Sequence, residues 1–401
     1  MKVFKLILVW IILGGNILTA QPSIRLYAMG HSLIDHRPPA IPTPGDETTI
    51  IFWMYDMALA AGYDFAAGGQ YGFLDTHAHL PPAFNWWYDE VPGVWDEATM
   101  NTFSDADINT LLLTAANFIQ YQPASEPYPL DETTTALALT ETIFDWIHEQ
   151  EEGANFYIYA NWPEMDLQNA FPGTLPLQSE IDGFHTYTMG DFTSWWIDYQ
   201  DSLLVSRPEL NVRLIPVGAT ISKVLTEVIP NQIPFDELYE DAAPHGRPTI
   251  YFLAAMITYM AIYEEEVPAD YMPGNLVHEA IRNNFIAIRD YIWQALNDFN
   301  LPNGQSRVFA SPVMNANNEN LERKDIEIFP NPSTGQIALS GNREGYFLKI
   351  MDIYGHTLLK NEYIAASKEL DISSLPNGLY FIQFWDKVSG IKVVKRIMKV
   401  N

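Results

Sequence analysis

Residues 24–33 of the chain read Ile-Arg-Leu-Tyr-Ala-Met-Gly-His-Ser-Leu. The run 24–28 is short and mostly apolar, which is typical of a strand that is buried on both faces of a sheet. It leads into Gly30 and Ser32, and a serine at the corner after a strand can present its hydroxyl above the sheet. This stretch therefore predicts a buried strand and a first candidate nucleophile, Ser32.

Apolar runs and helical patterns alternate through most of the chain on either side of this motif. The expected strands are 108–115, 155–160 and 212–217, and the expected helices are 47–61, 133–150, 192–205, 251–263 and 284–300. Strands that alternate with helices favour a parallel sheet covered by helices on both faces. We therefore predict an α/β domain, in which the long segments 71–105 and 161–182 are loops.

The pattern changes after residue 302. Residues 303–324 are polar, contain Asn, Gly and Ser, and have no periodicity, so we expect a linker. From residue 325 onward, short strand-like segments are separated by turn signals such as Asn377-Gly378. The expected strands are 326–329, 336–339, 346–352, 379–384 and 393–400. This pattern predicts a small all-β sandwich over residues 325–401.

The first twenty residues have the pattern of a signal peptide. Lys2 and Lys5 precede an apolar run at 6–13, and Ala20 offers a small residue for cleavage before Gln21. The apolar run is short for a membrane span, and no later stretch reaches eighteen uninterrupted apolar residues. We therefore expect an exported chain with a signal peptide at 1–20 and no transmembrane segment in its mature form.

Charge is distributed unevenly along the chain. The formal net charge is −28; residues 325–401 carry 9 basic and 8 acidic side chains, which leaves 13 basic and 42 acidic side chains in residues 1–324. So acidic a surface repels phosphate backbones, and no nucleic-acid partner is expected. The chain has no cysteine. This excludes disulfides, thiol nucleophiles and thiolate metal sites.

Four sequence blocks mark the C-terminal segment. The first is Phe329-Pro330-Asn331-Pro332-Ser333-Thr334-Gly335, and the others lie at 349–356, 370–380 and 392–400. In this order they resemble the type A sorting domain of the type IX secretion system found in Bacteroidetes. The resemblance implies that the chain crosses the outer membrane through the type IX machinery. It also implies that the domain is commonly removed afterwards, leaving a product that is secreted or attached to the outer cell surface.

A candidate general base lies late in the larger domain, within Asp241-Ala242-Ala243-Pro244-His245-Gly246. An imidazole titrates near neutrality and can take a proton from a serine such as Ser32. A carboxylate a few residues away, here Asp241, can hold the ring in the required tautomer. Pro244 and Gly246 indicate a shaped loop rather than a helix at His245.

Two further positions are candidate donors to an oxyanion. Gly68-Gly69 allow a close backbone approach to a ligand. Asn117 follows the strand expected at 108–115, where a strand end meets the mouth of a parallel sheet. The sequence thus offers Gly69 and Asn117 as substrate-binding candidates.

Taken in chain order, Ser32, Gly69, Asn117, Asp241 and His245 resemble the four blocks of the SGNH (GDSL-like) hydrolase superfamily. The resemblance implies a flavodoxin-like fold over residues 21–302 and Ser-His(-Asp) hydrolysis of an ester, for instance in an acetylated glycan. It implies no metal and no cofactor.

Three departures from the family pattern leave alternatives open. The first block reads Gly-His-Ser-Leu where Gly-Asp-Ser-Leu is usual. The third reads Ala-Ala-Asn-Phe and lacks the usual Gly and following Asp, so Asn161, after the strand expected at 155–160, is an alternative to Asn117. Three residues rather than two separate Asp241 from His245, which leaves open a triad or a Ser-His dyad.

Two other functions compete with ester hydrolysis. Asp75, His77 and His79 form an Asp-x-His-x-His pattern that a metal-dependent hydrolase could use. A non-catalytic surface binding protein on an SGNH scaffold is the other alternative, because the motifs are altered. Several aromatic residues near the expected site either stack on sugar rings or pack loops: Trp86, Trp87, Tyr88, Trp95 and Trp162.

Overall fold

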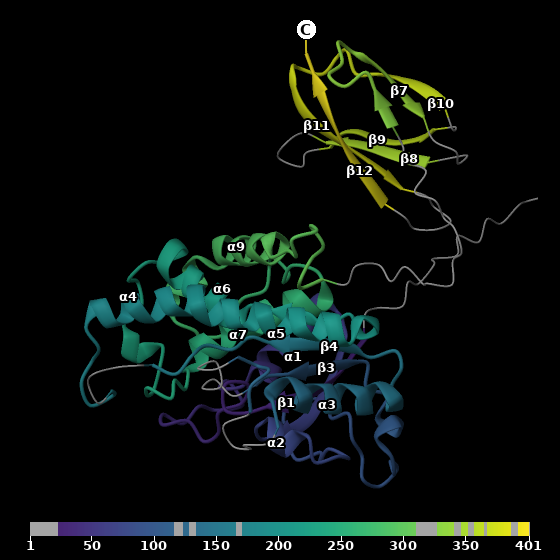
Figure 1. The fold of residues 1–401 in the computed structure, drawn as a ribbon. Coiled ribbons are helices and arrows are strands. Elements are labelled where there is room, and N and C mark those ends of the chain that lie inside the picture. The colour runs from purple at the N-terminus through teal and green to yellow at the C-terminus, as the bar shows by residue number, and fades with distance from the viewer. Residues whose placement is uncertain are drawn as a thin grey trace, which may run out of the picture. The chain divides into compact units, whose positions relative to one another are not determined.

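The computed structural model describes residues 23–115, 123–127, 134–165, 171–309, 327–340, 346–351, 357–364, 367–385 and 392–400. The chain divides into two compact units, Met1–Pro312 and Val313–Asn401 (Figure 1). The expected signal peptide and the candidate Asn117 lie outside the described residues.

A five-stranded parallel sheet forms the centre of the larger unit. Its strands are β1 (Ser23–Gly30), β2 (Asp64–Tyr71), β3 (Thr110–Leu113), β4 (Asn155–Tyr159) and β5 (Arg213–Ile215), in the order β2-β1-β3-β4-β5. The predicted parallel sheet is confirmed. Strand β2 was not predicted, because its sequence Asp-Phe-Ala-Ala-Gly-Gly-Gln-Tyr contains small residues instead of an apolar run.

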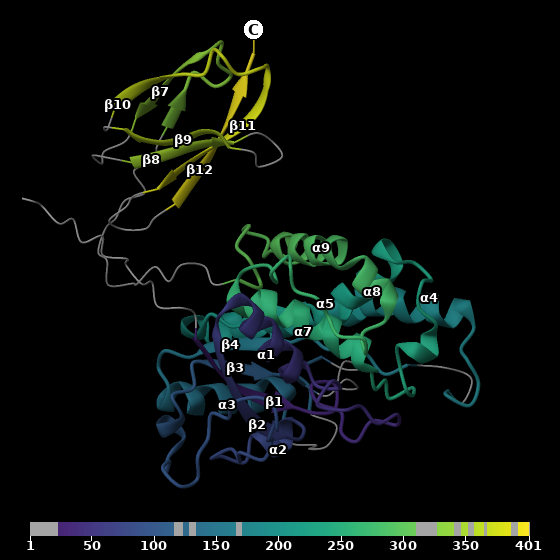
Figure 2. The same cartoon turned by 180° about the vertical axis from the view of Figure 1, so that it is seen from behind.

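Helices cover both faces of this sheet, and successive residues of β1 alternate between two cores. Leu26 and Ala28 join the core under α1 (Ile50–Ala61), α7 (Pro248–Tyr263) and α9 (Phe285–Asp298). Tyr27 and Met29 join the opposite core, under α3 (Ala136–Gln150) and α5 (Thr193–Ser206). This period of two is what a strand buried on both faces requires, and the helical layers are visible in Figures 1 and 2.

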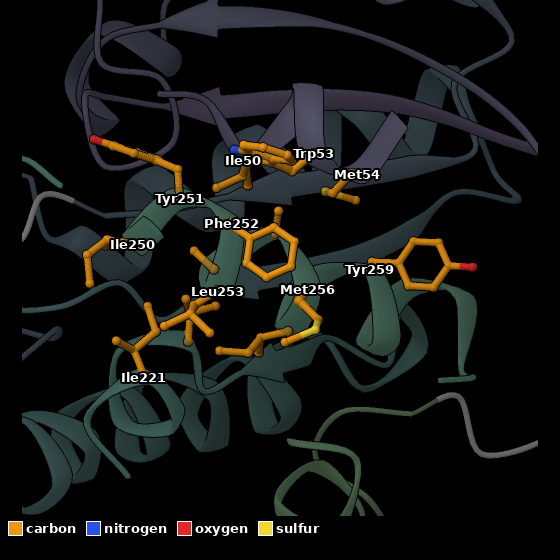
Figure 3. Close-up of a cluster of buried hydrophobic side chains, with 14 of the residues drawn as sticks. Ile50, Trp53, Met54, Ile221, Ile250, Tyr251, Phe252, Leu253, Met256 and Tyr259 are labelled. Atoms are coloured by element: carbon orange, nitrogen blue, oxygen red, sulfur yellow. The ribbon is translucent and has the colours of Figure 1, made fainter. Parts of the chain in front are cut away.

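Helix α7 is apolar on every side and is enclosed by the core. Every residue from Thr249 to Tyr263 is buried, and Pro248 occupies the first helical turn, where its missing N–H costs no bond. Figure 3 shows its side chains packed against those of α1, with the Tyr251 hydroxyl pointing out of the apolar cluster. The helix is therefore a fixed support for any residue that it contacts.

Shorter helices complete the larger unit. They are α2 (Leu74–His77), η1 (Phe103–Ala106), α4 (Gln178–Tyr187), η3 (Thr188–Phe192), η4 (Pro208–Leu210), α6 (Val217–Lys223), η5 (Val224–Val228), η6 (Phe235–Glu237) and α8 (Glu279–Asn283). The long segment 71–105 thus contains α2 and the start of η1, and α4 begins inside 161–182. The predicted helix boundaries agree with the structure within a few residues, and Gly62 ends α1 in the left-handed region, with φ 75°.

The first part of the expected linker belongs instead to the larger unit. The amide of Leu214 on the edge strand β5 donates to the carbonyl of Arg307 at 2.8 Å. The buried Arg307 guanidinium binds Asp201 at 2.6 Å, and Val308 is fully buried. The prediction of a linker was therefore wrong for residues 303–309, because their polar composition concealed this packing. Residues 310–326 lie outside the described residues.

The C-terminal unit is all-β. Its strands are β6 (Glu327–Phe329), β7 (Gln336–Ser340), β8 (Tyr346–Met351), β9 (Thr357–Ile364), β10 (Ser367–Asp371), β11 (Gly378–Trp385) and β12 (Lys392–Lys399). They form antiparallel sheets in the orders β10-β7-β6 and β12-β11-β8-β9. Buried Ile337 and Leu370 from the first sheet and Ile350 and Ile382 from the second share one core. Strands β9 and β10 were not predicted.

Among the described residues of both units, no helix combines the length and the apolar character needed to cross a membrane.

Candidate functional site

Ser32 lies in the turn that follows β1, and two buried tyrosines hold that turn. The Tyr251 hydroxyl, from the first turn of α7, donates to the Ser32 carbonyl at 2.6 Å. The Tyr159 hydroxyl, at the end of β4, donates to the Leu33 carbonyl at 3.2 Å. Burial raises the pKa of both phenols, so both remain neutral donors. The position of Ser32 is thereby tied to the core.

A short hairpin, residues 238–247, carries the other two predicted residues. The Glu240 amide donates to the His245 carbonyl at 2.8 Å, and Tyr239 pairs with Gly246 in an antiparallel bridge. The indole of the buried Trp162 donates to the Pro244 carbonyl at 2.9 Å, which anchors the tip. The loop expected from Pro244 and Gly246 is therefore a fixed hairpin.

Ser32, His245 and Asp241 form a continuous hydrogen-bond relay. Ser32 Oγ lies 2.8 Å from His245 Nε2, and His245 Nδ1 lies 2.8 Å from Asp241 Oδ2. A carboxylate accepts from Nδ1–H, so Nε2 of the neutral ring is left to accept the serine proton. The relay joins residues 213 positions apart in sequence. Its geometry is that of a nucleophile, a base and an orienting carboxylate.

The extra residue between Asp241 and His245 is accommodated by the turn itself. The Oδ1 atom of Asp241 accepts from the backbone amides of Ala243, at 2.9 Å, and His245, at 3.1 Å, while Oδ2 faces the imidazole. Burial alone would raise the pKa of Asp241, but the hydrogen bonds from His245 and Ala243 outweigh it and lower the pKa. Asp241 is therefore an ionised partner of the ring.

A second histidine lies directly on His245. The rings of His36 and His245 stack with centroids 4.0 Å apart and planes 7° from parallel. His36 Nε2 lies 3.0 Å from a carboxylate oxygen of the buried Glu240, whose oxygens also accept from the Ala40 amide. Burial and the neighbouring His245 lower the pKa of His36, although Glu240 opposes this. His36 and Glu240 were not predicted from the sequence. His36 belongs to no motif, and the one signal for Glu240 was its position beside Asp241.

A buried polar group lies next to Ser32 in sequence. His31 Nε2 lies 3.1 Å from the Ala115 carbonyl, and burial lowers the pKa of His31 to about 4, so the ring is neutral. Asn161 Nδ2 donates to Thr114 Oγ1 at 3.0 Å and to the Ala115 carbonyl at 2.9 Å. The amide of Asn161 is thus engaged at the end of β3. This gives no support to Asn161 as the alternative oxyanion donor.

Gly69 occupies the interior of β2 and not a strand end. It is paired with Ala28, and a Cβ at position 69 would lie 2.0 Å from the Ala28 carbonyl oxygen. Its own carbonyl accepts from the amides of Asn85 and Trp86. The close backbone approach expected of this glycine is therefore to the neighbouring strand β1. The structure does not bring Gly69 to the relay.

Most of the aromatic residues proposed to stack on sugars are packed inside the unit. Trp86, Tyr88 and Trp162 are buried, and Trp95 stacks on Phe84 with ring centroids 4.3 Å apart. Of the five, Trp87 is the exposed one, with 51% of its surface accessible. Loop packing accounts for the others.

The Asp75, His77 and His79 pattern does not converge on a metal site. His77 is fully buried, and burial lowers its pKa to about 3, whereas His79 is exposed. Within the described ranges, no three His, Asp or Glu side chains are placed to hold a metal ion. The geometry therefore gives the metal-dependent alternative no support.

A separate cavity of about 370 Å³ lies beside the start of the hairpin. Its walls are polar and apolar in equal measure: they come from α4, η5, η6 and the loop between η5 and η6, and include Leu238. Its polar residues include His185, whose Nδ1 is 3.0 Å from Ser222 Oγ and whose pKa burial lowers to about 4. The hairpin that carries Asp241 and His245 is thus in contact with this cavity through Leu238.

The comparisons with known proteins match part of the chain. A search of curated proteins found no match. Among solved structures, the chain is similar to PorZ, an essential surface component of the type-IX secretion system of Porphyromonas gingivalis. The identity is 19%, over 20% of this chain and 12% of that chain, with a TM-score of 0.18. The chain thus spans a small part of that protein's length.

A family model identifies the C-terminal unit. Residues 327–400 match the secretion system C-terminal sorting domain, which covers β6 to β12 and includes all four sequence blocks from Phe329 onward. Such a domain engages the type IX secretion machinery, and it places the product outside the cell or on its outer surface. Residues 327–400 therefore belong to the secretion system C-terminal sorting domain family.

Proposed function

We propose that the larger unit is an SGNH-like serine ester hydrolase that acts through Ser32, His245 and Asp241. The relay with two 2.8 Å contacts carries this proposal. The strand order β2-β1-β3-β4-β5 supports it, because this is the order of flavodoxin-like sheets. In such sheets, ligands bind beyond the carboxyl ends of the strands, where the turn containing Ser32 lies.

The proposed reaction is acyl transfer in two steps. His245 Nε2 takes the proton of Ser32 Oγ as the oxygen attacks the ester carbonyl carbon. The tetrahedral intermediate then expels the alcohol, which receives that proton from His245. A water molecule attacks the acyl-serine with His245 again as base, and the acid and free Ser32 are released. Asp241 stabilises the imidazolium that forms in each step.

The negative oxygen of the intermediate requires hydrogen-bond donors. The backbone amide of Ser32 and the side chain of Asn117 would be these donors. Gly69 is omitted, because its place inside β2 is explained by contact with β1.

The proposed substrate class is an ester that an exported enzyme meets outside the cell. Acetyl esters of glycans are the first to test, since export by the sorting domain places the enzyme among surface and environmental polysaccharides. The acidic surface of the larger unit favours neutral esters over anionic ones, because like charges repel.

Hydrolysis by purified wild type, Ser32→Ala, His245→Ala and Asp241→Asn tests the proposal on p-nitrophenyl acetate and acetylated xylan. We expect the Ser32 and His245 variants to lose about 10³-fold or more in kcat, and Asp241→Asn to lose less. A fluorophosphonate should label wild type at Ser32 and leave Ser32→Ala unlabelled. Circular dichroism controls for folding. A folded wild type that neither hydrolyses esters nor reacts with the probe would favour the surface binding protein.

A further inference from the structure

We propose that His36 is a positioning residue for His245, whose stacked ring fixes the plane in which His245 faces Ser32. This inference rests on the proposed function of the relay. His36 and Glu240 form a second carboxylate–histidine pair, and its ring lies against the ring of the first pair, His245 and Asp241.

The relay by itself does not fix the His245 ring completely. Its contacts, to Asp241 at Nδ1 and to Ser32 at Nε2, lie at opposite sides of the imidazole. Each contact is a single hydrogen bond with a broad range of tolerated angles, so the ring can still tilt through small rotations about its Cα–Cβ and Cβ–Cγ bonds. A flat group against the ring face prevents this tilt, and His36 is such a group, 4.0 Å away and 7° from parallel.

His36 is itself held at its backbone and its ring. Its amide donates to the Thr48 carbonyl at 3.0 Å, and its carbonyl accepts from Thr48 Oγ1 at 2.7 Å. Its Nε2 is bound to Glu240, and the Glu240 carboxylate is fixed by the Ala40 amide at 2.9 Å. A ring fixed at both ends can restrain a second ring.

One hairpin supplies both carboxylates. Glu240 and Asp241 are consecutive, yet Glu240 reaches His36 while Asp241 reaches His245. The Glu240 amide also donates to the His245 carbonyl at 2.8 Å. The spacing of the two carboxylate–histidine pairs is therefore set by the hairpin and not by mobile side chains.

The neutral form of His36 is the productive one, because His245 has to act as a base beside it. Glu240, Asp241 and His245 face it from the hairpin, and Arg247 lies 3.8 Å from Glu240. On its own loop, Arg37 and Asp35 pair with each other. A protonated His36 would place a positive charge 4.0 Å from the ring that must accept the Ser32 proton. That charge would oppose the transfer of the Ser32 proton to the neighbouring imidazole.

Three substitutions at His36 distinguish the effect of its ring on His245 from the effect of its hydrogen bond to Glu240. His36→Ala removes both, His36→Phe keeps a flat ring without Nε2, and His36→Gln keeps an amide donor for Glu240 without a ring. The matched control is His278→Asn. His278 also lies near a glutamate, Glu237 at 3.5 Å, and Asn can still accept from the Ala280 amide at the start of α8.

The measurements are kcat and KM for p-nitrophenyl acetate across pH, and NMR of ¹⁵N-histidine-labelled protein to follow the Nδ1–H of His245. For His36→Ala we expect kcat to fall about 10- to 100-fold with KM nearly unchanged, and the Nδ1–H resonance to broaden. His36→Phe should restore most of kcat and a sharp Nδ1–H resonance of His245, whereas His36→Gln should restore neither. His278→Asn should match wild type.

Two results would overturn the role of His36. One is an unchanged kcat and an unchanged His245 resonance in His36→Ala; the other is a rescue by Gln as complete as that by Phe. The NMR arm does not depend on turnover. If wild type hydrolyses no ester but the His245 resonance still broadens in His36→Ala, the positioning role is supported while the proposed function fails.

Discussion

Tyr251 donates its hydroxyl proton to the carbonyl of Ser32 at 2.6 Å, across 219 residues of sequence. The tyrosine belongs to the first turn of α7, which the core encloses on every side. The turn that presents Ser32 is therefore held in place by a hydrogen bond from the deeply buried helix α7. Serine position and helix packing are coupled through this one hydrogen bond.

Tyr251→Phe should weaken both stability and turnover. It leaves the Ser32 carbonyl without this donor, and we expect about 1–2 kcal/mol lower unfolding free energy in urea. Because Ser32 would be less well placed, kcat should fall by about tenfold. The control is Tyr291→Phe, which removes an exposed bond to Glu227 and should cost less than about 0.5 kcal/mol. Equal effects in both variants would contradict the coupling.

Acid should destabilise the larger unit before its carboxylates are protonated. Burial lowers the pKa of His31 and His185 to about 4 and of His77 to about 3, so the fold holds all three neutral. The unfolded chain binds protons below its ordinary histidine pKa of about 6.5. Their stabilisation is complete above that pH and is lost as pH falls toward 4, by about 1.4 kcal/mol per unit for each histidine.

Urea unfolding between about pH 7.5 and pH 5 measures this slope. His185→Gln should flatten it, because one buried titratable group is removed. His79→Gln, at an exposed position, should leave the slope of wild type. An unfolding free energy that is constant over this range would contradict the prediction.

Gly69→Ala should damage the fold rather than the chemistry alone. The added methyl would meet the Ala28 carbonyl at 2.0 Å, and separating β1 from β2 should cost about 3 kcal/mol in urea unfolding. Gly183→Ala, inside α4 with open space around it, is the matched control and should stabilise by up to about 1 kcal/mol. A stable Gly69→Ala with lost activity would return Gly69 to the role of oxyanion donor.

Removal of metal ions should not affect hydrolysis. The proposed relay supplies its own base and needs no Lewis acid. Dialysis against a chelator and the substitution His79→Ala should both leave kcat/KM unchanged. Activity that is lost on chelation and returns with zinc would instead favour the Asp75, His77 and His79 alternative.

The sequence predicted those parts of the fold whose pattern reflects burial. The strand at 24–28 and the helix at 251–263 are predominantly apolar runs, and both are elements of the core. Strand β2 was missed because Gly68 and Gly69 allow close packing without bulky side chains. The packing of Arg307 was missed because a polar segment pairs here through its backbone, which composition does not record.

The relay was predicted more completely than its surroundings. Ser32, Asp241 and His245 occur in motifs with distinctive turn residues, so their proximity could be predicted from chain order and residue type. His36 follows Ser32 closely but belongs to no motif, and its contact with His245 depends on how the hairpin packs against the loop. Interactions of that kind follow from tertiary packing and have no signature in a single sequence.

The contact between Arg307 and β5 also bears on maturation. Strand β5 is the last strand of its sheet, and the Arg307 carbonyl satisfies an amide that would otherwise be open for pairing with another chain. Proteolytic trimming that spares Phe309 would release the sorting domain and leave this edge protected. Trimming before Arg307 would expose the Leu214 amide and remove Val308 from the core, and the exported product would become prone to aggregate. A stable mature protein therefore has to retain the residues up to Phe309 that cover the edge strand β5.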